Sequence, residues 1–490
     1  MNGDTLQRAS EQDHRTMTGD SLPYVPYVPY AADLPLSAEY DAIVAGGGAA
    51  GVVAAIQAAR AGARTALVEK NGILGGTAVV AAVNFPGLFH AWGRQIIAGI
   101  GWEILEETVR RGGAVLPDFS VDPGRAHWRH QIRVNRFVYA TVLDDLCRGA
   151  GVTLRFYELP AAVRPLGGDE AAGGLGRIGR TALVVAGKTG LEALATRTLV
   201  DATGDADLAG LMGYPRRRSE HLQPGTLIYE LDGYDLARVD LQALAARYAV
   251  ARARGEILPT DHTRGEPPLY RELASGGGSC NHVLGIDGAT SAARTDAELK
   301  GRQAVLRVYR LLRQVPGCES LRVSFVANEC GIRETRRIVG EREVTVARYA
   351  SGYVWEDAIC YSFYPIDVHQ PDSMAIDIRP LARGVVPTIP YGALIPAGSD
   401  RLLVAGRCIA GDQEANSAYR VQATCMATGQ AAGAAAALAA QARGSVRAVD
   451  VPTLRALLRA HGAIVPDLPA EAGETGEPLP AAAGPTAEAR

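Results

Sequence analysis

The stretch IVAGGGAAGVVAAIQAARAGARTALVEK, residues 43–70, most constrains the fold of this 490-residue chain. An apolar segment typical of a buried strand leads into a run of small residues, a helix pattern and a second apolar strand. Gly46, Gly48 and Gly51 stand at the first junction with GxGxxG spacing, and Glu69 ends the second strand. This order predicts a strand, a tight turn, a helix and a parallel strand, the unit that binds a dinucleotide.

Each part of this pattern has a physical role. The first glycine allows a tight turn, the second lets the backbone approach a pyrophosphate, and the third brings the helix close to the sheet. Amides at the helix start, helped by the helix dipole, hold the phosphates. A carboxylate at Glu69 accepts the ribose hydroxyls and rejects a 2'-phosphate, so NADP is disfavoured, and NAD and FAD remain. The expected nucleotide contacts are Gly46, Gly48, Ala49, Ala50, Gly51, Glu69 and Lys70.

Strand and helix patterns alternate on both sides of this unit and predict an α/β fold with a parallel sheet flanked by helices. Three short strand patterns separated by glycine-rich turns, at 161–166, 180–187 and 195–204, predict a small antiparallel insertion that returns to the main sheet. A helix rich in small residues at 423–442 is expected to pack closely against its neighbours.

The domain organisation follows from where these patterns weaken and resume. Between residues 221 and 384 the alternation is weak except for a long helix pattern near 295–315, which indicates a second, α+β domain. The predicted order is an extended or disordered arm at 1–38 with the repeat PYVPYVPY, the first part of the dinucleotide-binding domain at 39–220, a substrate or cap domain at 221–384, the second part of the dinucleotide-binding domain at 385–445, and a C-terminal helix with a disordered tail at 446–490.

Composition narrows the class of protein. A net charge of -3 with 21% charged residues gives no basic surface, so we expect no nucleic-acid partner. The seven cysteines form no CxxC pair or metal-ligand cluster, which predicts reduced thiols and no metal. The chain carries no secretory signal pattern and no apolar run of bilayer length, so we expect a cytoplasmic protein without a membrane partner.

Three later stretches, EKNGILGGTA at 69–78, VDATGDAD at 200–207 and LLVAGRCIAGDQEANSAYRVQATCMATGQAAG at 402–433, resemble FAD-dependent oxidoreductases of the two-dinucleotide-binding-domain type, in the glutathione-reductase and succinate-dehydrogenase-like fold group. Within that group, GIRETRRIVGE and YPIDVHQP are similar to a broad FAD-dependent oxidoreductase family. The resemblance spans about residues 39–445. It implies FAD as the cofactor and a Rossmann-like FAD-binding domain with a discontinuous α+β cap.

The resemblance also implies further flavin contacts. The GGT segment is expected to run under the pyrophosphate, and the ATG strand end to close over the cofactor. Arg407 is expected to contact the phosphates or brace its turn, Asp412 to reach the ribityl chain, and the backbone at the start of the last helix to approach the flavin. The residues are Gly75, Gly76, Thr77, Ala202, Thr203, Gly204, Gly406, Arg407, Asp412, Val421 and Gln422.

The reaction class is less constrained. A second GxGxxG does not follow in the middle of the chain, so NAD(P)H has no obvious dock, and electrons should leave to oxygen, a quinone or a carrier protein. QEANSAYR after Gly411–Asp412 departs from the flavin hydroxylase pattern, which disfavours monooxygenation. We expect a dehydrogenase or oxidase that takes hydride from a small polar organic molecule. A flavin-containing tRNA-modifying or binding protein and a redox-inactive flavin scaffold stay open, as does a homo-oligomer.

Candidates for the chemistry come from the cap and from the segment after GGTA. His369, in a proline-bounded aromatic loop, is the first choice for a proton acceptor and His90 the second, although either can simply brace a loop. Arg333 lies one helical turn from Arg337 if the segment is helical, and is expected to bind an oxygen of the substrate, while Arg337 pairs with Glu334 or Glu341. Tyr364 can line the pocket or pack in the core.

Overall fold

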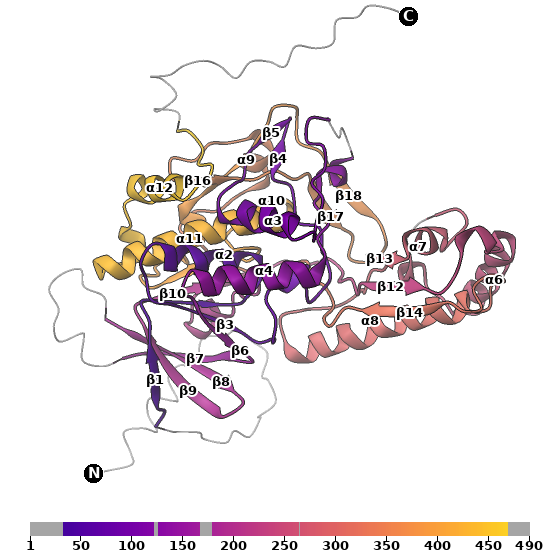
Figure 1. Ribbon diagram of the computed structural model, residues 1–490, viewed down its shortest axis with the longest axis horizontal. Coiled ribbons are helices and arrows are strands. Elements are labelled where there is room, and N and C mark those ends of the chain that lie inside the picture. The colour runs from indigo at the N-terminus through magenta and orange to yellow at the C-terminus, as the bar shows by residue number, and fades with distance from the viewer. Residues whose placement is uncertain (1–32, 122–125, 167–178, 264, 469–490) are drawn as a thin grey trace, which may run out of the picture. The chain divides into compact units, whose positions relative to one another are not determined.

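A five-stranded parallel sheet carries the dinucleotide-binding unit in a computed structural model that describes residues 33–121, 126–166, 179–263 and 265–468 (Figure 1). The strand order is β20-β10-β2-β3-β6, and every neighbouring pair is parallel. Strands β2, β3, β10 and β20 are buried along their whole length, because both faces of a parallel sheet are covered. The bounds are β2 Ala42–Ala45, β3 Thr65–Glu69, β6 Thr153–Phe156, β10 Thr198–Asp201 and β20 Leu402–Val404.

Helices α2 (Ala49–Arg60), α3 (Ile100–Arg110), α4 (Arg136–Gly149) and α11 (Gln422–Ala442) pack with this sheet in the main core. Helices α2 and α11 pack closely against each other. A Cβ atom on Gly429 or Gly433 of α11 would lie 2.2 or 2.1 Å from a carbonyl oxygen of α2. The prediction that the small residues of 423–442 allow close packing is confirmed.

A four-stranded sheet in the order β1-β9-β8-β7 adjoins the parallel sheet, and β7, β8 and β9 are antiparallel. Strand β9 ends two residues before β10, so the chain returns directly to the main sheet, as the sequence predicts. The strand pattern at 195–204, however, covers mainly β10 of the main sheet, and the sequence analysis misses most of β9, Gly190–Thr196. The bounds are β1 Leu36–Glu39, β7 Leu159–Pro165, β8 Thr181–Gly187 and β9 Gly190–Thr196.

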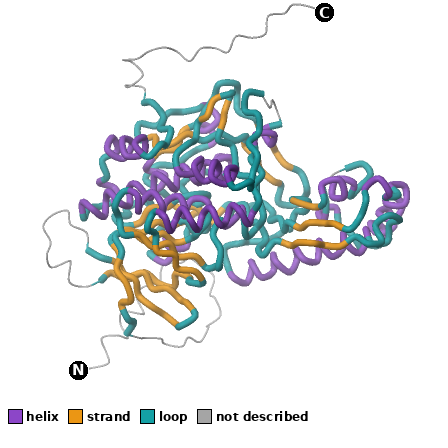
Figure 2. The backbone as a smooth tube through the Cα atoms, viewed as in Figure 1, coloured by secondary structure: helices purple, strands orange, loops and turns teal. Residues whose placement is uncertain are grey.

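Residues between 227 and 327, together with Ala82, build a second hydrophobic core, in the lobe that Figures 1 and 2 show beside the parallel sheet. Its three-stranded sheet has the antiparallel order β13-β12-β14, and α8 confirms the long helix predicted near 295–315. From Ile338 onward the buried residues belong to the main core again. The bounds are β12 Tyr229–Asp232, α6 Leu241–Ala253, α7 Tyr270–Ser275, β13 Gly277–Gly278, α8 Ser291–Leu312 and β14 Arg322–Val326.

Two-stranded antiparallel pairs join the remaining segments: β4 (His90–Ala91) with β5 (Arg94–Gln95), β11 (Arg216–Arg218) with β15 (Arg336–Ile338), β16 (Ala358–Tyr361) with β19 (Thr388–Pro390), and β17 (Ile366–His369) with β18 (Ile376–Arg379). Short helices complete the description: α5 Asp207–Leu211, α9 Val346–Ser351, α10 Gln413–Tyr419 and α12 Val451–Ala460, with 3-10 turns at 76–78, 127–130, 236–238, 259–261, 391–394 and 446–448.

One local prediction is wrong. The segment that contains Arg333 and Arg337 is a loop followed by strand β15, and these residues do not share a helical face. Strand β15 pairs with β11, and the buried side chain of Arg337 pairs with Glu334 at 3.2 Å. Tertiary pairing therefore overrides the helical spacing of the two arginines.

The chain divides into the units Met1–Pro35 and Leu36–Arg490, and every element above belongs to the second. The repeat at 23–30 and most of the predicted arm and tail lie outside the described residues. None of the described helices is long and apolar enough to cross a bilayer. All seven cysteines are buried free thiols.

Candidate functional site

The turn between β2 and α2 has the geometry that its glycines predict. Gly46 has a φ of +101°, and a Cβ atom there would lie 2.4 Å from the carbonyl oxygen of Ala202 on the neighbouring strand. A Cβ atom on Gly51 would overlap the carbonyl oxygen of Gly46 at 1.7 Å, whereas one on Gly48 would meet only the Cα atom of Gly76, at 4.0 Å. The turn is therefore tight, α2 lies close to the sheet, and the backbone of Gly48 is open to a bound group.

Two long helices begin at this pocket without a side-chain cap. Among the described helices of ten or more residues, α4, α6, α8 and α12 have a side-chain cap, whereas α2, α3 and α11 have none. The first amide of α3 is taken by Gln430 at 3.2 Å. The N-termini of α2 and α11 thus keep amide donors for a ligand, at the two places where the sequence predicts phosphate and flavin contacts.

Glu69 ends β3 at the rim of the same pocket and is only 6% exposed. Its Oε2 atom accepts a hydrogen bond from the amide of Gly47 at 2.6 Å, and its Oε1 atom accepts one from the amide of Asn71 at 2.8 Å. Burial raises the pKa of this carboxyl group above its ordinary value, and the two amides oppose that shift. The carboxylate is fixed beside the glycine turn, where a ribose would meet it.

The pocket brings together most of the predicted cofactor residues. Those that line it are Gly46, Gly48, Ala49, Ala50, Glu69, Lys70, Gly76, Thr77, Ala202, Thr203, Gly204, Gly406, Arg407 and Gln422. Four predicted residues do not line it: Gly51, Gly75, Val421 and Asp412. Gly51 acts through helix packing and Val421 is the N-cap of α11. Asp412 instead caps α10, and its two oxygens accept from the amides of Ala415 and Val346 at 2.8 and 2.6 Å.

Asp205, which follows the ATG strand end, organises one wall of the pocket. It accepts hydrogen bonds from Arg407 at 2.7 Å, Arg294 at 2.6 Å and Thr335 at 2.8 Å. Arg407 also donates to the carbonyl oxygen of Gly204 at 2.7 Å, so of its two expected roles the structure shows the bracing one. The nearby guanidinium groups of Arg407 and Arg294 hold the pKa of the Asp205 carboxyl group low, although burial alone would raise it. Sequence reasoning used the ATG of this motif and missed Asp205 and Arg294.

Arg333 connects the cofactor pocket with the predicted chemistry. It lines the pocket and donates to the carbonyl oxygen of Pro224 at 2.5 Å and to Oγ1 of Thr226 at 3.0 Å. Burial, with the nearby charge of Arg420, lowers its pKa to about 10, while Asp367 acts in the opposite direction. Arg420 lines the same pocket and donates to the carbonyl oxygen of Asp367 at 3.4 Å.

His369 lies beside this group at the end of β17 and is 9% exposed. Its Nδ1 atom is 2.9 Å from Nε2 of His282, and its Nε2 atom is 3.6 Å from a carboxylate oxygen of Asp367. Burial, followed by the charge of Arg333, lowers the pKa of His369 to about 3, although Asp367 raises it. Burial lowers the pKa of His282 to about 4. Both imidazoles are therefore neutral near pH 7.

The hydroxyl group of Tyr364 contacts His127 and Gln131. Its hydroxyl group is 3.1 Å from Nε2 of His127 and accepts a hydrogen bond from Nε2 of Gln131 at 3.3 Å. Burial raises the pKa of this phenol, so it stays protonated and can donate a hydrogen bond. Sequence reasoning missed His282, Asp367, Gln131 and His127, because only the fold brings them to His369 and Tyr364.

His90 is apart from this cluster. Its ring stacks on Phe119 with centroids 3.7 Å apart and meets Trp102 edge-on. Burial lowers its pKa to about 4, and the residue does not line the cofactor pocket. The structure thus places His90 in an aromatic cluster.

The sequence was compared with protein families and with known proteins. A family model described as FAD dependent oxidoreductase matches residues 41–458. Dihydrolipoyl dehydrogenase of Trypanosoma brucei brucei is 50% identical over 58 residues, which are 12% of each chain, so the chain spans only a small part of that relative.

Solved structures with similar folds include p-nitrophenol 4-monooxygenase of Pseudomonas putida, with 14% identity and a TM-score of 0.38. They also include a geranylgeranyl bacteriochlorophyll reductase-like protein of Thermoplasma acidophilum, with 12% identity and a TM-score of 0.40. Each alignment covers 86% of this chain and 83% of the other. At these values the likenesses say nothing about the reaction.

The residues of the pocket fit FAD. The open backbone at Gly48 and the amides of α2 suit a pyrophosphate, the fixed carboxylate of Glu69 suits a ribose, and the second set of amides at α11 suits the flavin end. With the family model matching residues 41–458 as well, the chain belongs to the family of FAD-dependent oxidoreductases.

Proposed function

We propose that this protein oxidises a small polar organic molecule and that His369 holds the proton released in the reaction. Bound FAD supplies the hydride acceptor. The observation that carries the proposal is that Arg333 and Arg420 both line the cofactor pocket, and Arg420 donates to the carbonyl oxygen of Asp367 at 3.4 Å, next to His369. Proton-transfer groups and a fixed cation thus lie beside the place where the cofactor residues converge.

The hydrogen bonds of the two histidines define where a proton can go. Nδ1 of His282 lies 2.7 Å from the carbonyl oxygen of Ser373, which can only accept, so Nδ1 carries the hydrogen. Nε2 of neutral His282 then accepts from Nδ1 of His369. This leaves Nε2 of His369 with a free lone pair, 3.6 Å from the carboxylate of Asp367. A proton that reaches Nε2 is stabilised by that carboxylate.

Arg333 and Tyr364 have complementary roles in the proposal. Arg333 donates hydrogen bonds to Pro224 and Thr226, and these two bonds hold the guanidinium group in place at the pocket. A fixed cation can orient a polar oxygen of the substrate at little entropic cost. The protonated Tyr364 hydroxyl can donate to the same molecule.

The test is anaerobic mixing of the FAD-loaded protein with panels of alcohols, amines, hydroxy acids and saturated acids, while the colour of the oxidised flavin is followed. Bleaching by one panel supports the proposal and identifies the bond oxidised. Oxygen, a soluble quinone and a carrier protein are then compared for recolouring, which identifies the electron acceptor.

Three outcomes would replace this proposal. Bleaching only by NAD(P)H, with one oxygen atom from O2 in the product, assigns monooxygenation. A salt-sensitive shift of tRNA in a gel revives the tRNA-modifying alternative. Tight FAD binding without bleaching by any panel indicates a redox-inactive scaffold.

A further inference from the structure

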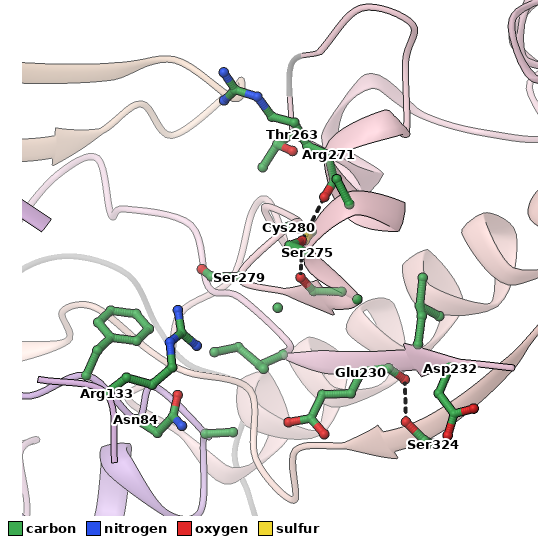
Figure 3. A pocket seen from close by; sticks show the side chains of 18 of the residues that line it. Asn84, Arg133, Glu230, Asp232, Thr263, Arg271, Ser275, Ser279, Cys280 and Ser324 are labelled. Carbon is green, nitrogen blue, oxygen red and sulfur yellow. Dashed lines mark hydrogen bonds between the residues drawn. The ribbon is translucent and has the colours of Figure 1, made fainter. Parts of the chain in front are cut away.

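A second cavity, of about 1010 Å³, lies between the lobe and the dinucleotide-binding part (Figure 3). Strands β12 and β13 form one side, and the segments near Asn84 and Arg133 form the other. Its volume is that of a small-molecule site. The function proposed above leaves this cavity without a role.

The cavity adjoins the catalytic candidates through residues 131–134. Ile132 and Val134 are buried in the core, so the alternating positions Gln131 and Arg133 face the cavity. Gln131 also donates to the hydroxyl of Tyr364 at 3.3 Å. One short extended segment therefore lines the cavity and contacts the histidine and tyrosine cluster.

The opposite wall shows the same relationship. Cys280 lines the cavity, and two residues later His282 lies 2.9 Å from His369. Short segments on both walls of the cavity thus lead to Tyr364 and to the histidine pair.

The charges that line the cavity are unequally paired. Glu230 accepts from Arg136 at 2.8 Å, and Asp232 pairs with Arg322 at 2.9 Å. Within the described parts of the chain, neither Arg133 nor Arg271 pairs with a carboxylate, and the guanidinium of Arg133 lies over the ring of Phe85, 5.8 Å from its centroid. Three arginines and two carboxylates line the cavity, so its formal charge is 3 − 2 = +1.

A small polar side chain, Ser279, lies on the cavity wall near Arg133. Figure 3 shows Ser279, in the glycine-rich run 275–280, on the same side of the cavity as the guanidinium of Arg133, whereas the guanidinium of Arg271 is directed to the opposite side. A Cβ atom on Gly278 would meet nothing within 4 Å, so the glycine-rich wall leaves room for a ligand. A guanidinium fork with a hydroxyl donor is suited to a carboxylate.

We propose that this cavity holds the substrate and that Arg133 and Ser279 bind its carboxylate group. The inference rests on the proposed function and names its substrate class: a small carboxylic acid whose oxidised carbon points toward the cofactor pocket. The two carboxylates of the lining and the net charge of +1 favour a monoanion over a phosphate dianion.

The test is isothermal titration of the FAD-loaded protein with acetate, succinate, benzoate and phenylacetate, each beside its amide, and with inorganic phosphate. At least one carboxylate should bind, and its amide about 10-fold more weakly or worse. Arg133→Gln should weaken that carboxylate about 10- to 100-fold, the usual effect of losing a charge-assisted hydrogen bond, with FAD content unchanged. Arg271→Gln should weaken it less, because this side chain lies farther from Ser279 in Figure 3.

The matched control is Arg110→Gln on α3, an exposed arginine that pairs with Glu107 far from the lining, and its affinities should match the unmodified protein. Binding that is equal in the Arg133→Gln variant, tighter binding of phosphate, or no carboxylate binding overturns the inference. Arg133-dependent binding of a carboxylate that never bleaches the flavin would sustain the cavity assignment and overturn the proposed oxidation, so the two failures are distinct.

Discussion

Nδ1 of His369 lies 2.9 Å from Nε2 of His282, although 87 residues separate them in the chain. One histidine comes from β17, and the other comes from the segment that follows β13. Both imidazoles are buried, and Nε2 of His369 lies beside the carboxylate of Asp367. Because Nδ1 of His282 donates to Ser373 and Nε2 of His282 accepts from His369, only the lone pair on Nε2 of His369 is free to take a proton. This arrangement has consequences for catalysis and for acid stability.

Replacing His369 by glutamine removes that lone pair while it preserves most of the volume. We expect flavin reduction by the best substrate to slow about 100-fold or more in His369→Gln, the usual contribution of a general base, with FAD retained. Stopped-flow reduction measures the rate. The matched control is His90→Gln, in the aromatic cluster with Phe119, which should leave the rate within a factor of about two. If flavin reduction were slow in His90→Gln and normal in His369→Gln, the proton acceptor would be His90 and not His369.

The histidine pair should also make the fold sensitive to acid. Burial lowers the pKa of His282 to about 4 and that of His369 to about 3 in the folded protein, from an ordinary value of 6.5. At a pH between the folded and the ordinary pKa, the unfolded chain binds more protons than the folded protein does. The free energy of unfolding therefore falls as the pH falls below 6.5. At pH 5 a single such histidine costs about 2 kcal/mol relative to pH 7.

Urea unfolding at pH 7 and pH 5 checks this effect. His282→Gln should lose about 2 kcal/mol less than the unmodified protein between the two pH values, because glutamine does not titrate. An equal loss in both proteins would show that this histidine is not held neutral by burial.

The sequence predicts the cofactor half of the site well because its signals are local. The GxGxxG turn, Glu69 at the end of β3 and the small residues of α11 each combine a short motif with a periodic pattern, and the structure places them around one pocket or against one helix. Such signals depend on neighbours within one strand, turn and helix.

The other half of the site depends on contacts between distant segments. Asp205 meets Arg407 across 202 residues, and Gln131 meets Tyr364 across 233. No local period marks such pairs. The spacing of Arg333 and Arg337 even suggests a helix, whereas pairing of β15 with β11 makes part of the segment extended. Single-sequence reasoning therefore selected His369 and Arg333 by residue type and missed the side chains that they contact.

Gly429 tests the close packing beneath the cofactor pocket. A Cβ atom there would lie 2.2 Å from the carbonyl oxygen of Ala50, a backbone atom that cannot move without shifting α2. Gly429→Ala should therefore lower the free energy of unfolding by about 1–3 kcal/mol and weaken FAD binding. Gly444→Ala, just beyond the same helix, is the control, because its nearest contact is at 3.8 Å. Equal urea midpoints for the two variants would refute the packing argument.

Glu69 tests the nucleotide assignment itself. In addition to the ribose contact that we propose, its carboxylate accepts from the amides of Gly47 and Asn71, so replacement can act through the turn as well as through the ligand. Glu69→Gln separates the two effects, because its amide oxygen can still accept from Gly47 while the charge is lost. We expect FAD to bind about 10- to 100-fold more weakly in Glu69→Gln, and Glu69→Ala to lose FAD during gel filtration. Flavin content and fluorescence titration of the apoprotein measure both. Full retention of FAD by a folded Glu69→Ala variant would exclude this carboxylate from the ribose and would move the sugar to another part of the pocket.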